Sequence, residues 1–585
     1  MQANSSTQRL LRIRIFYGAL VFLCMLFVIR LFYLQVIRHD YYQKLAVSFQ
    51  QKEKEIPAER GLILAHNGDG TTPIVLNETL YTLFADPKYV TDIDVAAAKI
   101  QSVVGGSYKD YVSAMKLDTR YAILKKKLTS DQKQKIDKLE LKGIGTRDAI
   151  YRTYPQGQLA AQLLGFVNDD GVGKYGVEQA LNKDLSGQSG QLKAITDAQG
   201  IPLASNPSNI LIEPQAGKQV LLTIDLGIQQ QLEDILKQGL DNVHSSSGSA
   251  VIIDPNTGAI KAMANFPTYN PAQFYKVSDA SVFTDPAVSS PLEIGSTMKP
   301  FTAAAALDQG VVNRNSTYYD PSHFTIGDAT VSNIEEDGGP GVKSIADILQ
   351  LSLNTGATWL LMQMGGGQIN QKARVAWHDY MVNHYQFSKP TGVEQGYEAD
   401  GVVPDPINGY GLDITYANTA FGQGMTATPL QMAAALSSVV NGGTYYRPHL
   451  VDEMTDSSGR TFATPVSIVR QNVVKPEVSQ TIKELMEYVI SKNHVLYGLT
   501  DLRPEYGIGG KTGTAQIAKP GGGYYDDRYN GTFMGFVGGD QPQYVIVVRV
   551  NEPHIGGYAG SKAAAPIFSA LANMLINNFG VTPKS

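Results

Sequence analysis

The sequence predicts an α+β protein. We expect an antiparallel sheet flanked by helices, with an additional helical subdomain, preceded by an elongated mixed domain and one N-terminal membrane helix. Three observations support this prediction. A long apolar stretch follows a basic leader, the residue pattern changes near residue 216, and the segment beyond begins and ends with strands that enclose a helical middle. Strands at both ends of a segment favour one sheet whose two halves meet in space.

The composition fits a folded protein and excludes several classes of function. Of 585 residues, 43% are apolar and 18% are charged, which is typical of globular chains. The formal net charge of −5 and the lack of a basic block argue against nucleic-acid binding. The single cysteine, Cys24, excludes an internal disulfide, and the nine histidines form no metal-ligand pattern, so we expect no metal and no cofactor.

The N-terminal stretch predicts a membrane anchor. Residues 1–14 carry three arginines and no acid, and residues 15–37 are apolar apart from Gln35 and Arg30. As a helix, residues 15–37 would rise about 34 Å, enough to cross a hydrocarbon core of about 30 Å. A cleaved signal peptide would need a small-residue cleavage site, which is missing, and a buried core helix would not usually carry a basic leader. The positive-inside rule places residues 1–14 in the cytoplasm and the chain after the helix outside the membrane.

Residues 38–215 predict a mixed domain that acts as a spacer or docking module. The expected elements are a polar helix over residues 41–56, a turn into a strand over 56–64, a lysine-rich helical section over 93–142, and short strands up to 214. Glu178 begins a match to the E-x-x-L-N element that supplies a deacylating glutamate in class A β-lactamases. Because it precedes Ser296, which is the candidate nucleophile, instead of following it, we interpret Glu178 as a structural helix start.

Residues 216–585 predict the α+β domain. The expected elements are a strand at 218–223, a helix at 225–240, a hairpin of 248–254 and 259–264, a helix at 296–309, strands at 506–517, 531–539 and 543–551, and a closing helix at 566–579. The tract over residues 521–531 is rich in glycine and tyrosine, and it predicts either a mobile hairpin over the site or a plain solvent loop.

Ser296 is the candidate nucleophile. A proline in the first turn, four consecutive alanines and a terminal glycine predict a helix on which Lys299 lies one turn after Ser296. A serine hydroxyl needs a neighbouring base, and a lysine can be that base only if burial or a second cation lowers its pKa. We therefore expect a second cation near Lys299. Two other Ser-x-x-Lys matches, at Ser113 and Ser130, are interpreted as chance matches on solvated helix surfaces.

A second polar pair follows at Ser352 and Asn354. They end a predicted helix over residues 344–353, which opens with a capping-box-like signal at Ser344. A hydroxyl and an amide that leave a helix together can pass a proton and hold a peptide carbonyl.

A third segment runs from Lys511 through Thr512 and Gly513 to Thr514 in a predicted strand. It contains the single Lys-Thr-Gly of the sequence. Lys511 is the expected second cation and could also attract a carboxylate. We expect the glycines of this strand to let a substrate backbone approach closely.

The order and spacing of these motifs resemble a known set. Ser-x-x-Lys, then Ser-x-Asn 56 residues later, then Lys-Thr-Gly 159 residues further on, is similar to the motif set of β-lactamases and penicillin-binding proteins. Over nearly its whole length the chain resembles the class B penicillin-binding proteins, the monofunctional peptidoglycan D,D-transpeptidases. Further similar segments are Arg60-Gly61-Leu62-Ile63, Gly176-Val177-Glu178, Tyr269-Asn270-Pro271, Gly422-Gln423-Gly424 and Thr428-Pro429-Leu430-Gln431. The D-R-N-G that usually follows the first segment is replaced by Ala65-His66-Asn67-Gly68, so the detail of the N-terminal domain departs from the family pattern.

The resemblance implies an acyl-enzyme mechanism. Ser296 would attack the penultimate D-Ala carbonyl of a peptidoglycan stem peptide, with Lys299 as the base. Ser352 would relay a proton to the departing D-Ala, and Asn354 would hold the substrate backbone. The remaining roles would fall to Lys511, Thr512, Gly513 and Thr514, which bind the terminal carboxylate, and to the N–H groups of Ser296 and Thr514, which form the oxyanion hole. An amine of a second stem peptide would complete the cross-link, and β-lactams would acylate Ser296.

Three alternatives share parts of this chemistry. A β-lactamase-like hydrolase would need a glutamate or carbamylated lysine to activate water, and a membrane-anchored β-lactam sensor would need a signalling module where only 14 residues precede the helix. A D,D-carboxypeptidase typically lacks so long an N-terminal domain. By analogy with the family, glycan polymerisation would fall to a multi-span SEDS glycosyltransferase that contacts the membrane helix, itself in membrane lipid. The sequence leaves open whether the enzyme serves elongation, division or sporulation.

Overall fold

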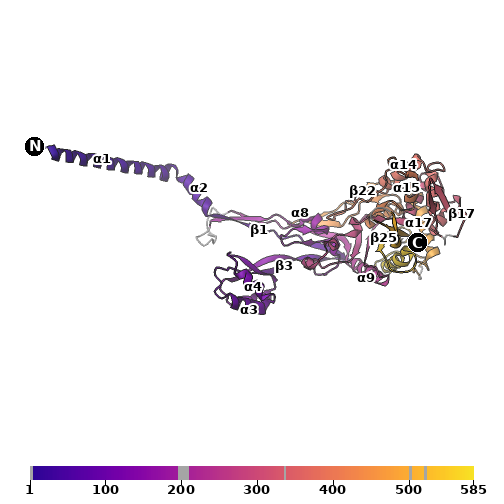
Figure 1. Ribbon diagram of the computed structural model, residues 1–585, viewed down its shortest axis with the longest axis horizontal. Helices are drawn as coiled ribbons and strands as arrows, with labels where there is room; N and C mark the ends of the chain where they lie inside the picture. The colour runs from indigo at the N-terminus through magenta and orange to yellow at the C-terminus, as the bar shows by residue number, and fades with distance from the viewer. Residues whose placement is uncertain (1–3, 196–209, 335–337, 500–502, 520–522) are drawn as a thin grey trace. The chain divides into compact units, whose positions relative to one another are not determined.

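The chain forms two compact units, traced in Figure 1. The computed structural model describes residues 4–195, 210–334, 338–499, 503–519 and 523–585. The first unit comprises Met1–Glu59 and Gly187–Ala216, and the second comprises Arg60–Ser186 and Gly217–Ser585.

The first unit holds the apolar helix and a small sheet. Helix α1 (Asn4–Phe32) continues through a π-helical turn (Tyr33–Ile37). Among the described residues, Arg9–Ile37 is the one helix long and apolar enough to cross a membrane, with a mean hydropathy of 2.5. Helix α2 (His39–Gln50) leads into β1 (Gln51–Ile56), which pairs with β8 (Gly190–Ile195), and β8 pairs with β9 (Ile210–Ile212).

The predicted helix over residues 41–56 is therefore wrong in its last six residues. Residues 51–56 form β1 because β8, far along the chain, supplies antiparallel backbone partners for them. Such a partner overrides local helix propensity and leaves no trace in the local sequence.

The second unit contains a seven-stranded sheet covered by short helices, to which β20 and β21 are added from late in the chain. Its strands run in the order β21-β20-β10-β2-β3-β4, and β5 also pairs with β3. The elements are β2 (Ile63–Asn67), β3 (Gly70–Ala85), β4 (Ala122–Leu128), β5 (Ile144–Thr153), β10 (Gln219–Asp225), β20 (Val451–Thr455), β21 (Thr461–Ala463), α3 (Ile93–Val104), α4 (Tyr108–Met115) and α5 (Ser130–Asp137). The helical section predicted over residues 93–142 is interrupted by β4, which pairs with the long strand β3.

A buried ionic cluster joins distant parts of this region. Glu178, in α7 (Gly176–Ala180), has a fully buried side chain. Its Oε2 accepts from Arg60 Nε at 2.7 Å, and its Oε1 accepts from Arg152 Nε at 2.7 Å. Glu178 therefore stands at a helix start, as predicted, and there it holds two arginines 92 residues apart in the sequence.

The C-terminal part of the second unit is built on a five-stranded antiparallel sheet, which confirms the α+β prediction. The strand order is β12-β11-β25-β24-β23. The strands are β11 (Ser247–Ile253), β12 (Ile260–Phe266), β23 (Gly507–Ala518), β24 (Tyr524–Gly538) and β25 (Pro542–Asn551). Two helical layers cover it: α9 (Leu226–Asn242) packs with α18 (Ala565–Asn578), and α16 (Pro429–Val440) packs with α17 (Pro476–Asn493). The strands at the two ends of the domain thus meet at β11 and β25.

A helical subdomain lies between those strands in sequence. Its helices are α11 (Lys299–Asp308), α12 (Ile345–Gln350), α13 (Asn354–Met364), α14 (Gln371–Asp379) and α15 (Leu412–Thr419). The capping box predicted at Ser344 is present, since Ser344 Oγ accepts from the N–H of Asp347 and the Asp347 carboxylate accepts from the N–H of Ser344.

The tract predicted as either hairpin or loop is part of a hairpin, and most of its described residues belong to a strand. Residues 524–531 belong to β24, which pairs with β23 as far as Ala518 opposite Tyr524. Residues 521 and 522 of the tract lie outside the described residues.

We predict that Glu178→Gln destabilises the protein by about 3–5 kcal/mol, because removing one partner of a buried ion cluster leaves charge uncompensated in the interior. Denaturant unfolding of the full-length protein in detergent measures the change. The matched control is Asp137→Asn, which breaks the exposed Lys133–Asp137 pair and should cost only about 0–1 kcal/mol. Equal effects of the two substitutions would contradict the role assigned to Glu178.

Candidate active site

Ser296 lies in a tight 3₁₀ turn that opens the central helix. The turn (Gly295–Met298) runs directly into α11, so the helix predicted over residues 296–309 is confirmed in position, with a narrower first turn than expected. Helix α11 is buried along nearly its whole length, including Ala303, Ala304, Ala305 and Ala306. The small alanines let α11 lie close to α13, α16 and α17, which fixes the turn that carries Ser296.

Lys299 is the hub of the site. It is fully buried, and its Nζ lies 2.8 Å from Ser296 Oγ, 3.0 Å from Ser352 Oγ and 2.8 Å from Asn354 Oδ1. It also contacts the carbonyl oxygen of Ser352. An ammonium has three donors, and four oxygen atoms surround this nitrogen. This geometry leaves room for a hydroxyl to donate to the nitrogen when the amine is neutral.

Ser352 is the hydroxyl that both lysines contact. Its Oγ lies 3.0 Å from Lys299 Nζ and 2.9 Å from Lys511 Nζ. Lys511, the second cation expected near Lys299, thus lies at the site. Both lysines contact the same hydroxyl, that of Ser352. Ser352 has a left-handed backbone, with φ of 61°, at the joint between α12 and α13. A non-glycine residue in this conformation is held there by its surroundings.

Asn354 begins a helix, whereas the sequence predicted that it enters a loop. It is the first residue of α13. Its Oδ1 faces Lys299, and its Nδ2 donates to the carbonyl of Ser332 at 3.0 Å. Both ends of the amide are therefore oriented by the protein.

Strand β23 places Lys511, Thr512, Gly513 and Thr514 beside the Ser296 turn. Lys511 is 1% exposed, and its Nζ also lies 3.1 Å from the Thr512 carbonyl oxygen and 3.4 Å from the Thr512 hydroxyl. The Thr514 hydroxyl accepts from the N–H of Gly560 at 3.0 Å. All four residues predicted on this strand are thus found on it, at the edge of the sheet.

The glycine of this motif has a role in packing within the protein. A Cβ on Gly513 would lie 2.3 Å from Thr532 Oγ1 and 3.0 Å from the carbonyl oxygen of Ile294. Gly513 therefore lets β23 pack against the residues just before Ser296. The lack of a side chain at Gly513 therefore accommodates neighbouring parts of the protein.

Sequence reasoning missed Glu293, which ties three segments together next to Ser296. Its Oε1 accepts from the Tyr524 hydroxyl at 2.7 Å and from the N–H of Gly424 at 3.0 Å. Burial and this hydrogen bond both raise the pKa of Tyr524. The sequence places Glu293 three residues before Ser296. A single glutamate at that position does not predict contacts with Tyr524 and Gly424, which lie far along the chain.

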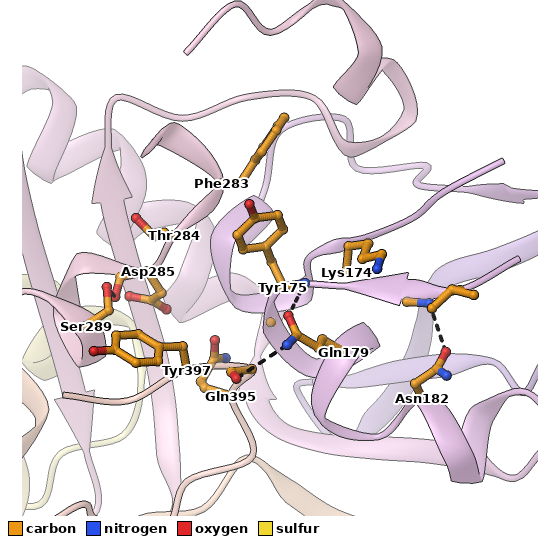
Figure 2. Close-up of a pocket in the computed structure, with 14 residues that line it drawn as sticks. Lys174, Tyr175, Gln179, Asn182, Phe283, Thr284, Asp285, Ser289, Gln395 and Tyr397 are labelled. Atoms are coloured by element: carbon orange, nitrogen blue, oxygen red, sulfur yellow. Dashed lines mark hydrogen bonds between the residues drawn. The ribbon is translucent and has the colours of Figure 1, made fainter. Parts of the chain in front are cut away.

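A separate cavity of about 640 Å³ lies elsewhere in the second unit (Figure 2). Its lining includes Tyr175 and Gln179 from the N-terminal part and Phe283 and Asp285 from the C-terminal part. The Gln179 side chain accepts from the N–H of Tyr175 at 2.7 Å and contacts the carbonyl of Gly396 at 3.5 Å, as the dashed lines show. None of the predicted site residues lines this cavity. The candidate active site is therefore identified from the hydrogen bonds among its side chains and not from a cavity.

Within the described ranges, no group of three or more histidine, cysteine, aspartate or glutamate side chains is arranged to hold a metal. The chemistry available at Ser296 is that of hydroxyls, amines and an amide.

Comparisons with known proteins agree with this geometry. The chain is 29% identical to stage V sporulation protein D of Bacillus subtilis over all of the chain and 88% of that relative. It is 28% identical to the peptidoglycan D,D-transpeptidase FtsI of Escherichia coli over 95% of the chain and 90% of that relative.

Solved structures share the fold. Penicillin-binding protein 2X of Streptococcus thermophilus superposes with a TM-score of 0.71 at 22% identity, covering 90% of this chain and 80% of that one. Penicillin-binding protein 3 of Mycobacterium tuberculosis, complexed with aztreonam, superposes with a TM-score of 0.67 at 25% identity, covering 91% and 98%.

Two family models match separate stretches of the chain. The penicillin-binding protein dimerisation domain matches residues 55–222. The penicillin binding protein transpeptidase domain matches residues 248–573, which is more than half of the sequence. The chain therefore belongs to the penicillin-binding protein transpeptidase family.

Proposed function

We propose that this protein is a peptidoglycan D,D-transpeptidase that cross-links stem peptides through an acyl-enzyme on Ser296 and is inhibited covalently by β-lactams. The observation that carries the proposal is the pair of contacts at 2.8 Å and 2.9 Å, from Lys299 to the Ser296 hydroxyl and from Lys511 to the Ser352 hydroxyl.

Acylation begins with the Ser296 hydroxyl. Burial and a neighbouring cation both disfavour the charged form of an amine, and Lys299 is fully buried with Lys511 bonded to the same Ser352 hydroxyl. A neutral Lys299 takes the proton as Ser296 Oγ bonds to the penultimate D-Ala carbonyl carbon. The N–H groups of Ser296 and Thr514 stabilise the oxyanion, a contribution of about 3–4 kcal/mol per donor in comparable sites.

Collapse of the tetrahedral intermediate breaks the D-Ala–D-Ala amide. The proton held by Lys299 passes through Ser352 to the departing D-Ala amine, since the Ser352 hydroxyl contacts both lysines. Asn354 holds the substrate backbone, and Lys511, Thr512, Gly513 and Thr514 bind the terminal carboxylate. The amine of a second stem peptide then attacks the ester, regenerating Ser296 and forming the cross-link.

The domain roles follow the same proposal. Residues 1–14 form a cytoplasmic tail, 15–37 a single membrane span in lipid, 38–215 a pedestal of the dimerisation type, and 216–585 the extracytoplasmic transpeptidase domain of a bacterial cytoplasmic-membrane protein. The exposed apolar surface of Arg9–Ile37 supports both lipid contact and a multi-span SEDS-family glycosyltransferase partner.

We predict that Ser296→Ala abolishes covalent labelling by a fluorescent penicillin, because no other hydroxyl forms the acyl bond. In-gel fluorescence of the full-length protein in detergent measures it. Ser130→Ala, in a Ser-x-x-Lys match on the helix surface, is the control and should label like the parent. Labelling that persists in Ser296→Ala would refute the assignment of the nucleophile.

Lys299→Arg should slow acylation by about 100- to 10,000-fold, because a guanidinium stays protonated and cannot act as the base. In the parent protein the neutral amine is the active form, so the acylation rate should rise with pH and then level off. Stopped-flow labelling across pH measures both effects. Lys133→Arg is the surface control, and a Lys299→Arg variant that keeps the parent profile would contradict the mechanism.

The acyl-enzyme formed with penicillin should persist, whereas a β-lactamase-like hydrolase would release it quickly. Intact-protein mass spectrometry after removal of free drug follows the adduct. A stem pentapeptide with a labelled D-amino acid as acceptor should yield the exchange product, which a sensor that only binds drug would not make. Rapid turnover of penicillin, or no exchange product, would favour those alternatives.

A further inference from the structure

A buried carboxylate lies behind the Ser352–Asn354 segment and belongs to no step described above. Asp320 ends β14 (Thr317–Asp320), which pairs with β17 (Gly341–Ser344). The hairpin of β15 (His323–Ile326) and β16 (Ala329–Ser332) follows it, and Asn333 comes directly after β16. Asp320 is 0% exposed.

Asp320 accepts from three donors. Its Oδ1 accepts from the N–H of Ser322 at 2.8 Å and from the Thr355 hydroxyl at 2.9 Å. Its Oδ2 accepts from Asn333 Nδ2 at 2.8 Å. A carboxylate can accept hydrogen bonds at both of its oxygens. An amide at this position would instead place its NH2 group against one of the three donors.

The carboxylate thereby fixes which way the Asn333 amide points. With Nδ2 turned to Asp320, Oδ1 of Asn333 accepts from the N–H of Thr355 at 3.0 Å and lies 3.0 Å from the Thr355 hydroxyl. A flipped amide would set oxygen against carboxylate and N–H against N–H. Asp320 therefore determines which group donates and which accepts in the hydrogen bonds that run from Asp320 through Asn333 to Thr355.

Asn354 is held by the same segment of chain. Its Nδ2 donates to the carbonyl of Ser332, and its neighbour Thr355 is bound through the backbone by Asn333. With both anchored, Asn354 Oδ1 faces Lys299 Nζ at 2.8 Å, and Lys299 contacts Ser296. Hydrogen bonds and the Ser332–Asn333 and Asn354–Thr355 peptide links thus connect Asp320 to the proposed base.

We propose that Asp320 and Asn333 are positioning residues, which orient Asn354 and through it Lys299 for acylation of Ser296. This inference rests on the proposed function of Ser296. It assigns a role in catalysis to groups that do not themselves touch the reacting atoms.

Reciprocal substitution tests it. Asp320→Asn places a donor against a donor, and Asn333→Asp places a carboxylate against a carboxylate. Each substitution should slow acylation by a fluorescent penicillin by about 10- to 100-fold, the effect expected when a catalytic group is misplaced by about 1 Å. The double variant Asp320→Asn/Asn333→Asp moves the carboxylate to position 333, where it can accept from Thr355 and from the new amide. It should recover most of the parent rate.

The controls separate positioning from folding. Asp456→Asn changes a carboxylate that accepts from the N–H groups of Ser458 and Arg460 in a surface turn, and it should leave acylation unchanged. Thermal midpoints of the full-length protein in detergent identify variants that fail to fold. If Asp320→Asn is one of them, Asn333→Ala, at a half-buried position, and the double variant carry the test.

Folded single variants that acylate at the parent rate, or a double variant as slow as the singles, would overturn the proposal. Its failure is distinct from failure of the proposed function, in which Ser296→Ala would still label or Asn354→Ala would acylate like the parent.

Discussion

The site depends on one arrangement: two buried lysines whose nitrogens both contact the Ser352 hydroxyl. Two ammonium groups this close in a buried setting lose hydration and repel each other. The energy falls if one of them gives up its proton, and Lys299, the one next to Ser296, is placed to do so. Under the proposed mechanism, this amine is the base that activates Ser296.

The arrangement of the two lysines around Ser352 depends on close packing at two glycines, Gly513 and Gly422, where a side chain would not fit. Gly513 leaves room for Ile294 and Thr532, and a Cβ on Gly422 would lie 2.0 Å from the carbonyl oxygen of Gly295. Gly295 itself donates its N–H to Gly422 at 3.0 Å. The turn carrying Ser296 is thus held between two segments that come much later in the chain. A methyl group at Gly422 would clash with the Gly295 backbone, and one at Gly513 would clash with the Thr532 side chain and press on the Ile294 carbonyl.

Much of this could be predicted from the sequence, because the signals are local. The terminal strands, the helix after Ser296 and the polar motifs each follow from periodicity, caps and short spacings. The missed features depend on partners far along the chain. Strand β1 exists through β8, and Glu293 acts through Tyr524 and Gly424. Local propensity carries no information about such partners.

The role of Gly513 shows the same limit from another direction. A glycine in a strand signals that something approaches closely, but the sequence does not say whether that is a ligand or the protein's own backbone. At Gly513 the close neighbours within the protein are the Thr532 side chain and the Ile294 carbonyl. Apolar core positions tolerate exchange of one hydrophobic residue for another of similar volume, and a likeness in fold at 22% identity fits that tolerance. Glycines in backbone contact and a carboxylate that accepts from three donors have no such substitutes. The geometry of this site therefore depends on a few small or polar residues, and the packed apolar core keeps them in place.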